Sequence, residues 1–222
     1  MMSYVDITEA REELKTVQRI AQGISSNEYL DKFKNIYGKE HPTLMDEMDR
    51  LNTKYRNPSK MADRIDVCKK YSFAIPNDKA IRKIAEFNPI IEIGSGTGYW
   101  AMLLQNAGVD IVAVDNNSWG HKWTKKWFES HIGNEGCLKN PEFKDRTLFL
   151  CWPPLEDEMA RRALENYRGN TFIYVGELWG GCCAEDSFFE ILDNEWEELE
   201  TINIPQWPCI HDYLIVYRRL DI

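Results

Sequence analysis

A short apolar run leads directly into three alternate glycines and then into a helix-like stretch, and this order constrains the fold more than any other part of the sequence. The run is IIEI at 90–93, the glycines are Gly94, Gly96 and Gly98, and the stretch at 99–106 has helical spacing. Gly94 permits a tight turn, and the missing side chains at Gly96 and Gly98 let a ligand lie on the backbone. A plain strand-to-helix turn would not need three such glycines.

Apolar runs alternate with helix-like stretches through the rest of the chain. Further strands are expected at about 111–114, 147–151, 171–175, 199–204 and 213–217, and helices near 159–169 and 184–192. The last two strands have no room for a crossover helix between them, so they should pair antiparallel. We therefore expect an α/β fold with a doubly wound, mostly parallel sheet and a C-terminal antiparallel hairpin.

The first 76 residues have the pattern of helices without strands. Helical spacing and capping residues predict helices over about 9–24, 27–36 and 43–55. We expect 1–76 to form an N-terminal helical extension that packs on the core, with a separate binding module as the alternative. Residues 77–222 should form the Rossmann-like domain, starting with a helix capped by Asn77, and the two parts one structural unit.

Composition narrows the class of protein. No stretch approaches the roughly 18 apolar residues that span a bilayer, and the N-terminus lacks a signal pattern, so we expect no membrane partner and a cytoplasmic location. The six cysteines form no CxxC pair and the four histidines lack metal-ligand spacing, which predicts reduced thiols and no metal site. The net charge is −9, with 15 acidic against 5 basic residues in 151–222, which disfavours nucleic acid and favours a small-molecule or protein substrate.

Two acidic residues flank the glycine loop. Asp115, seventeen residues beyond Gly98, closes the second expected strand, where a carboxylate can accept both hydroxyl protons of a ribose. Glu92 stands two residues before the first glycine, where it would repel a pyrophosphate and attract an ammonium group. The loop is also GxGxG and not the GxGxxG of dinucleotide folds. These features favour S-adenosylmethionine over NAD.

With these residues the chain resembles the class I S-adenosylmethionine-dependent methyltransferases, over about 90–218. The resemblance implies that the three glycines pass under the methionine and ribose, that Glu92 holds the amino group and that Asp115 binds the ribose. The neighbouring residues Ser95, Asn116 and Cys151 are further cofactor-binding candidates. The resemblance also implies a third strand within 116–145, although the sequence has no clear apolar run there.

The fourth motif of that family departs from its pattern here. The chain has LFLCWPPL, so Trp152 stands where amine-methylating members carry a polar residue, and Leu155 replaces an aromatic. This departure does not favour methylation of adenine and leaves a backbone carbonyl and a stacking face. Trp152 and Pro153 are candidate catalytic residues, or only a turn that ends the strand. Glu177 is a third candidate that would orient a substrate amine or accept its proton, or is a solvated loop acid.

Several other side chains have weaker patterns. Trp119, Trp123 and Trp127 recur every fourth residue and would line one helix face, as core packing beside the cofactor. A segment before Pro76 with Tyr71, Phe73 and Ile75 would fold over the cofactor as a lid. His211 and Asp212 adjoin in the last loop, where the carboxylate would orient the imidazole for proton transfer, unless the histidine is structural.

The sequence therefore predicts a methyltransferase whose acceptor is unknown. The alternative is a non-catalytic protein that binds the same cofactor and acts as an interaction module, which the replacement at Trp152 motivates. An NAD-linked oxidoreductase is a third hypothesis, which Glu92 and the loop spacing disfavour.

Overall fold

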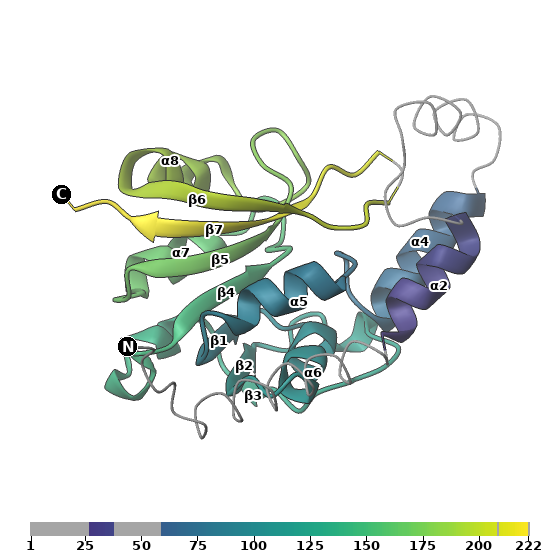
Figure 1. The fold of residues 1–222 in the computed structure, drawn as a ribbon, viewed down its shortest axis with the longest axis horizontal. Coiled ribbons are helices and arrows are strands. Elements are labelled where there is room, and N and C mark those ends of the chain that lie inside the picture. Colours follow the sequence, from purple (N-terminus) through teal and green to yellow (C-terminus); the bar gives the residue numbers. More distant parts are fainter. Residues whose placement is uncertain (1–26, 38–58, 208, 222) are drawn as a thin grey trace, which may run out of the picture.

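The computed structural model describes residues 27–37, 59–207 and 209–221, and its centre is one seven-stranded sheet (Figure 1). The strands are β1 (Ile90–Ile93), β2 (Ile111–Asp115), β3 (His131–Ile132), β4 (Thr147–Cys151), β5 (Thr171–Gly176), β6 (Trp196–Asn203) and β7 (Tyr213–Arg219). Their order across the sheet is β3-β2-β1-β4-β5-β7-β6. The neighbours from β3 to β5 pair parallel, whereas β7 pairs antiparallel with both β5 and β6. The expected fold class is confirmed.

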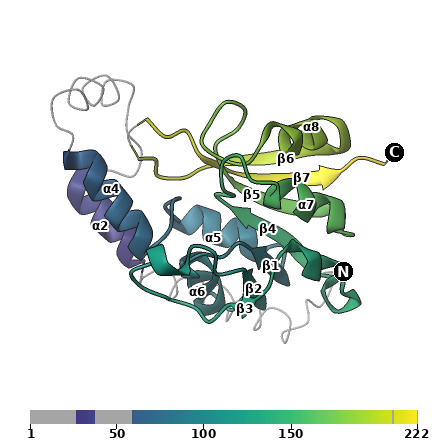
Figure 2. The ribbon, with the colours of Figure 1, turned by 180° about the vertical axis from the view of Figure 1, so that it is seen from behind.

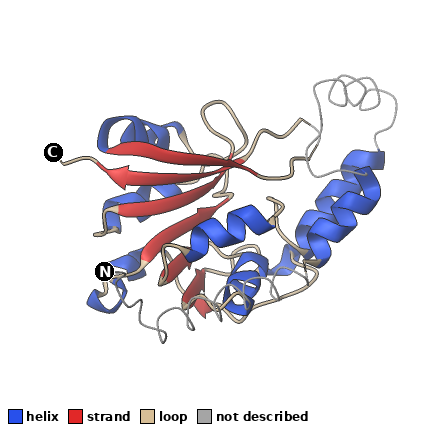
Figure 3. Ribbon diagram, viewed as in Figure 1, coloured by secondary structure: helices blue, strands red, loops and turns tan. Residues whose placement is uncertain are grey.

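Helices occupy both faces of this sheet (Figure 3). The α-helices are α2 (Glu28–Tyr37), α4 (Ser59–Lys70), α5 (Asp78–Ala85), α6 (Tyr99–Asn106), α7 (Met159–Asn166) and α8 (Asp186–Glu195). Short 3-10 turns are η1 (Gly120–Lys122), η2 (Glu135–Lys139) and η3 (Pro141–Phe143). The helix α5 begins as expected, because the Asn77 side chain accepts a hydrogen bond from the backbone N–H of Ala80 at 2.9 Å.

The sheet has a buried hydrophobic core on each face, which explains why its central strands are apolar throughout. Successive residues of β1 point to opposite cores: Ile90 packs with α5 and α6, and Ile91 packs with α7 and α8. Both side chains are fully buried. Each such burial contributes about 1.5–3 kcal/mol, so these strands hold the loops at their ends in fixed positions.

The expected third strand is present but has only two residues. His131 and Ile132 pair with the end of β2, and both side chains are exposed. A strand that buries nothing leaves no apolar run in the sequence, which is why the sequence shows no sign of it.

The helices before Pro76 pack on the sheet domain. Figure 2 shows α2 and α4 side by side at one end of the molecule. Tyr29 and Phe33 of α2 are fully buried in the same core as α5 and α6, and Trp207 Nε1 donates to the Tyr29 hydroxyl at 2.7 Å. The expected helix at 27–36 is confirmed, those at 9–24 and 43–55 lie outside the described residues, and the division at residue 76 stays a prediction.

The helix α4 is absent from the sequence-based expectations. Its sequence, SKMADRIDVCKK, is strongly polar, and Val67 and Cys68 are its buried apolar residues among those with described side chains. Two adjacent buried residues give no helical stripe, so periodicity does not reveal it.

Candidate functional site

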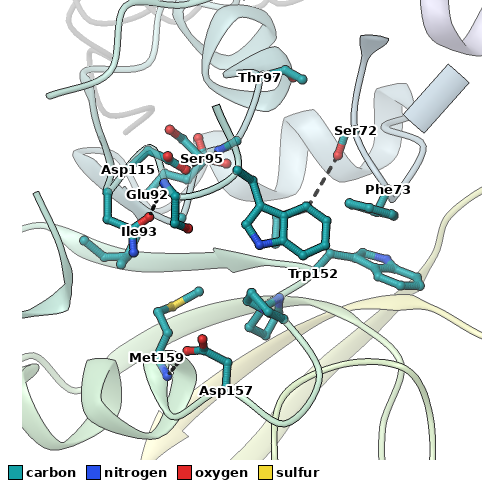
Figure 4. Close-up of a pocket in the computed structure, with 18 of the residues that line it drawn as sticks. Ser72, Phe73, Glu92, Ile93, Ser95, Thr97, Asp115, Trp152, Asp157 and Met159 are labelled. Carbon is teal, nitrogen blue, oxygen red and sulfur yellow. Dashed lines mark hydrogen bonds between the residues drawn. The ribbon is translucent and has the colours of Figure 1, made fainter. Parts of the chain in front are cut away.

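A cavity of about 470 Å³ opens where β1, β2 and β4 end, at the edge where open α/β sheets bind ligands. Nine of the eleven residues expected to bind the cofactor or act in catalysis line it: Glu92, Gly94, Ser95, Gly96, Asp115, Asn116, Cys151, Trp152 and Pro153. Two others, Gly98 and Glu177, are not among its lining residues. Figure 4 shows Glu92, Ser95 and Asp115 together on one side, and Phe73 with Trp152 on the other. We call these the acidic side and the aromatic side.

The glycine loop has two different structural requirements. Gly96 has φ of 57°, and a Cβ there would approach the Trp123 ring to 3.2 Å, so a side chain would enter the cavity. Gly98 has φ of 75°, and its Cβ would meet the Cβ of Phe128 at 2.6 Å. Gly98 therefore serves the close packing of the loop at the start of α6, whereas Gly96 keeps the cavity open.

Asp115 holds the glycine loop against the end of β2. Its Oδ2 accepts a hydrogen bond from the Gly96 N–H at 2.8 Å, and its Oδ1 accepts one from the Asn117 N–H at 2.7 Å. A carboxylate has about four acceptor sites, so each oxygen can still accept a bond from a ligand hydroxyl. The ribose-binding role expected for Asp115 is compatible with this geometry and stays a prediction.

Glu92 lines the acidic side of the cavity and is 1 % exposed. Its Oε2 has no hydrogen-bond partner among the described residues. Burial, with the nearby charge of Asp115, raises the pKa of Glu92 to about 8. An unpaired buried acid is costly, and a cation beside it would offset that cost by restoring the charged carboxylate.

The other expected cofactor-binding residues support the same loops. Ser95 Oγ lies 2.7 Å from Ser130 Oγ, and Asn116 Oδ1 accepts a hydrogen bond from the Ser118 N–H at 2.8 Å. Burial raises the pKa of Cys151 well above its ordinary value, so its side chain at the end of β4 is a neutral thiol.

Trp152 is held in place from several directions. It has a positive φ of 52°, and its indole Nε1 donates to Asp212 Oδ2 at 2.9 Å. Its ring stacks on Phe73, with centroids 5.4 Å apart and an interplanar angle of 19°. The guanidinium carbon of Arg64 lies 5.4 Å from the ring centroid. The Trp152 ring therefore stacks on Phe73, and its expected stacking on a substrate stays a prediction.

Asp212 pairs with Trp152, which differs from the expected role of orienting His211. Its side chain is 1 % exposed and its Oδ1 has no partner in the described part of the chain. Burial, with the nearby Glu177, raises the pKa of Asp212 to about 7, and the bond from Trp152 opposes this rise. His211 is exposed and does not line the cavity.

Glu177 is buried and ties two loops together. Its Oε2 accepts a hydrogen bond from the Cys182 N–H at 2.9 Å, and its Oε1 accepts one from the His211 N–H at 2.8 Å. At 6 % exposure it is not the solvated loop acid that the sequence left open. The geometry gives no support to a contact with a substrate amine.

The expected helix with Trp119, Trp123 and Trp127 on one face is wrong. Residues 116–130, which we call the strap, form an irregular segment with a single 3-10 turn. Trp119 and Trp123 line the cavity and meet Phe73 edge to face, at 6.3 and 6.1 Å between centroids. Trp127 packs elsewhere, against Tyr71 and Tyr99. The spacing of four residues therefore predicted a helix face that does not exist, because the strap is not α-helical.

The strap lies over the glycine loop and also contacts α4. Lys126 Nζ donates to the Gly96 carbonyl at 2.6 Å, and the Trp127 N–H donates to the Thr97 carbonyl at 2.8 Å. At α4, the Thr124 N–H donates to the Lys69 carbonyl at 3.1 Å. The expected lid segment is also at the cavity, with Tyr71 and Phe73 among the lining residues, whereas Ile75 is buried in the core.

Three cavity residues with ionic side chains escaped the sequence reading: Arg64, Glu135 and Asp157. Arg64 on α4 lines the cavity, and its Nε and Nη2 are buried without a partner among the described residues. The only signal for Arg64 in the sequence was a lone arginine in a helix that periodicity does not reveal.

Within the described ranges, no group of three or more potential metal ligands comes together, and no helix has the length and apolarity to cross a bilayer.

No protein-family model and no curated protein matches the sequence. Solved structures do resemble the fold. A magnesium protoporphyrin IX methyltransferase from Synechocystis with bound S-adenosylmethionine is 12% identical to this chain. The similarity covers 86% of this chain and 90% of that one, with a TM-score of 0.43. The 1,6-didemethyltoxoflavin-N1-methyltransferase of Burkholderia thailandensis, with bound S-adenosylhomocysteine, is 14% identical over 79% and 87%, with a TM-score of 0.43. Similarity this low assigns no activity, which has to come from the cavity residues.

Proposed function

We propose that this protein is an S-adenosylmethionine-dependent methyltransferase. The observation that carries the proposal is Glu92, a buried acid with an unpartnered oxygen beside the glycine loop and Asp115. This side of the cavity offers two carboxyl groups and a bare backbone. A ligand that fits it brings a cation for Glu92 and hydroxyl donors for Asp115.

The residues present fit S-adenosylmethionine in each of these respects. Its ammonium group would restore the charge of Glu92, and its ribose hydroxyls would donate to the remaining acceptor sites of Asp115. Gly96 keeps the space above the backbone open, since a Cβ there would narrow it against Trp123. When bound, this cofactor supplies a methyl group on a positively charged sulfur.

A dinucleotide fits the acidic side poorly. Its pyrophosphate carries negative charge, and Asp115 already raises the pKa of Glu92 by repulsion. A further anion beside these two groups would cost more, because like charges repel strongly where water is excluded. The arrangement favours a cationic adenosyl compound over NAD.

The chain's own residues contribute positioning and exclusion of water to methyl transfer. Trp152 and Pro153 line the cavity at the end of β4, and the rings of Phe73, Trp119 and Trp123 lie around them on the aromatic side. Holding a nucleophile and an activated methyl in line supplies most of what such a reaction needs. We further propose that the acceptor is a small molecule or a protein and that the protein acts in the cytoplasm.

Calorimetry with S-adenosylmethionine, S-adenosylhomocysteine and NAD tests the cofactor. We expect the two adenosyl compounds to bind, Asp115→Ala to weaken both at least about tenfold, and Asp145→Ala, at an exposed loop acid, to change neither. Binding of NAD alone would end the proposal. Transfer of labelled methyl to a cell extract then tests catalysis: cofactor binding without transfer to any fraction would favour the non-catalytic interaction module.

A further inference from the structure

The aromatic side of the cavity presents hydrogen-bond donors that nothing in the described part of the chain accepts. They are Arg64 Nε, Arg64 Nη2 and Trp123 Nε1, all buried at the level of the atom. Both residues line the cavity. A buried donor without an acceptor is costly, and a charged one more so. The cavity thus has an unpartnered acceptor on its acidic side and unpartnered donors on its aromatic side.

The two free nitrogens of Arg64 lie on the same edge of its guanidinium group. That edge matches the two oxygens of a carboxylate in a bidentate pair of hydrogen bonds. The group is also oriented, because its carbon lies 5.4 Å from the centroid of the Trp152 ring, and Trp152 is itself fixed by its bond to Asp212. Arg64 is therefore preorganised for a flat anion.

Arg64 lies beside the Trp152 ring, which Figure 4 places on the side of the cavity away from Glu92. Burial raises the pKa of Asp212 and of the Cys182 thiol, and the Arg64 charge opposes both rises. The raised pKa of Glu92, in contrast, has burial and Asp115 as its causes. An amino acid carries its carboxylate on the same carbon as its ammonium group. We therefore expect a methionine moiety held at Glu92 to keep its own carboxylate on the acidic side.

We propose that Arg64 binds a carboxylate of the methyl acceptor, a small molecule whose apolar, ring-sized body lies against Phe73, Trp119 and Trp123. The inference rests on the proposed function and gives its acceptor a chemical class. It also gives the N-terminal helices a role at the site, because Arg64 comes from α4 and the other cavity groups with unpartnered atoms come from β1 and the strap.

The test uses simple acids and their uncharged counterparts. The full chain, saturated with S-adenosylhomocysteine, is titrated with benzoate and indole-3-acetate and, separately, with benzamide and indole-3-acetamide. Calorimetry gives the affinities, and NMR follows the Arg64 Nε–H resonance. We expect each acid to bind at least about tenfold more tightly than its amide and to shift that resonance.

Variants assign the preference to one side chain. Arg64→Gln should abolish the preference for acids, and Arg64→Lys should keep part of it, since lysine retains the charge without the planar fork. Arg82→Gln, at an exposed arginine of α5, is the matched control and should change nothing. Thermal unfolding of each variant confirms that it is folded.

The outcomes separate the two proposals. Equal binding of acids and amides, no shift of the Arg64 resonance, or a preference that survives Arg64→Gln overturns the acceptor proposal while S-adenosylhomocysteine binding keeps the proposed function. If Arg64→Gln weakens S-adenosylhomocysteine but not 5′-methylthioadenosine, which lacks the amino-acid group, then Arg64 serves the cofactor's own carboxylate and the acceptor proposal is wrong. Failure of S-adenosylhomocysteine to bind the wild-type protein ends both.

Discussion

The indole N–H of Trp152 donates a hydrogen bond to Oδ2 of Asp212 at 2.9 Å, across 60 residues of sequence. It joins the loop after β4 to the residue just before β7, beneath the aromatic side of the cavity. Asp212 is buried, and Trp152 is the donor that opposes the rise of its pKa.

Trp152→Phe should destabilise the protein more at high pH than at low pH. The folded-state pKa of Asp212, about 7, is raised above its unfolded value, so its contribution to stability falls as pH increases up to that point. Removing the donor raises this pKa further and leaves a buried charge unpaired. We expect a loss of about 1–3 kcal/mol near pH 8 and a smaller loss near pH 5, by urea unfolding. Equal losses at both values would contradict the assignment.

Binding of S-adenosylmethionine should strengthen as pH rises towards 8. An ammonium group beside Glu92 lowers its pKa from about 8, so binding releases a proton. The affinity should rise by up to about tenfold per pH unit below about pH 8, until the ammonium group itself loses its proton. Calorimetry in buffers of different ionisation enthalpy measures the proton released. Glu92→Gln should bind S-adenosylmethionine weakly, with an affinity that does not change over this pH range. Tighter binding of S-adenosylmethionine to the wild type at low pH would show that its ammonium group does not lie beside Glu92.

Glu92→Gln should stabilise the ligand-free protein. The pKa of Glu92 is higher in the folded state than in the unfolded chain, so the folded state retains a proton and loses stability as pH rises up to about 8. Gln cannot ionise. The free energy of unfolding of Glu92→Gln, measured with urea, should therefore exceed that of the wild type by on the order of 2 kcal/mol near pH 8.5 and by less near pH 6. A variant less stable than the wild type at high pH would show that Glu92 is charged and well solvated.

Gly98→Ala should destabilise the protein more than Gly180→Ala. Both glycines have φ of 75°, so alanine costs about 1 kcal/mol of backbone strain at either position. The new Cβ at Gly98 would also meet Phe128 at 2.6 Å, whereas at Gly180 it meets nothing within 4 Å. Comparison of their unfolding free energies isolates the steric part. Equal losses would mean that the strap moves aside freely.

The parts of the fold that depend on short-range pattern could be predicted from the sequence. The strand at 90–93, the helix at 99–106 and the strand at 147–151 all occur with the expected bounds, because buried strands and capped helices leave apolar runs and breakers. Glu92 and Asp115 could be placed at the cavity for a related reason: both lie at the carboxyl end of a strand, the edge at which open α/β sheets bind ligands.

The parts that depend on long-range contacts could not be predicted. Arg64 lies on a helix whose described side chains include two buried apolar ones, and its place in the cavity depends on how α4 packs. The tryptophans of the strap had a helical spacing without a helix. Glu177 had a position at the correct sheet edge, yet its oxygens accept hydrogen bonds from the backbone of Cys182, nearby in sequence, and of His211, in a distant loop. Neither spacing nor composition records such pairings.

The strap makes hydrogen bonds to two neighbours: through Lys126 and Trp127 to the glycine loop, and through Thr124 and the Trp127 indole to the last turn of α4. A shift of either neighbour therefore strains the bonds to the other. Occupancy of one half of the cavity should alter affinity in the other half, so the two ligands of a two-substrate reaction would bind as a thermodynamically coupled pair.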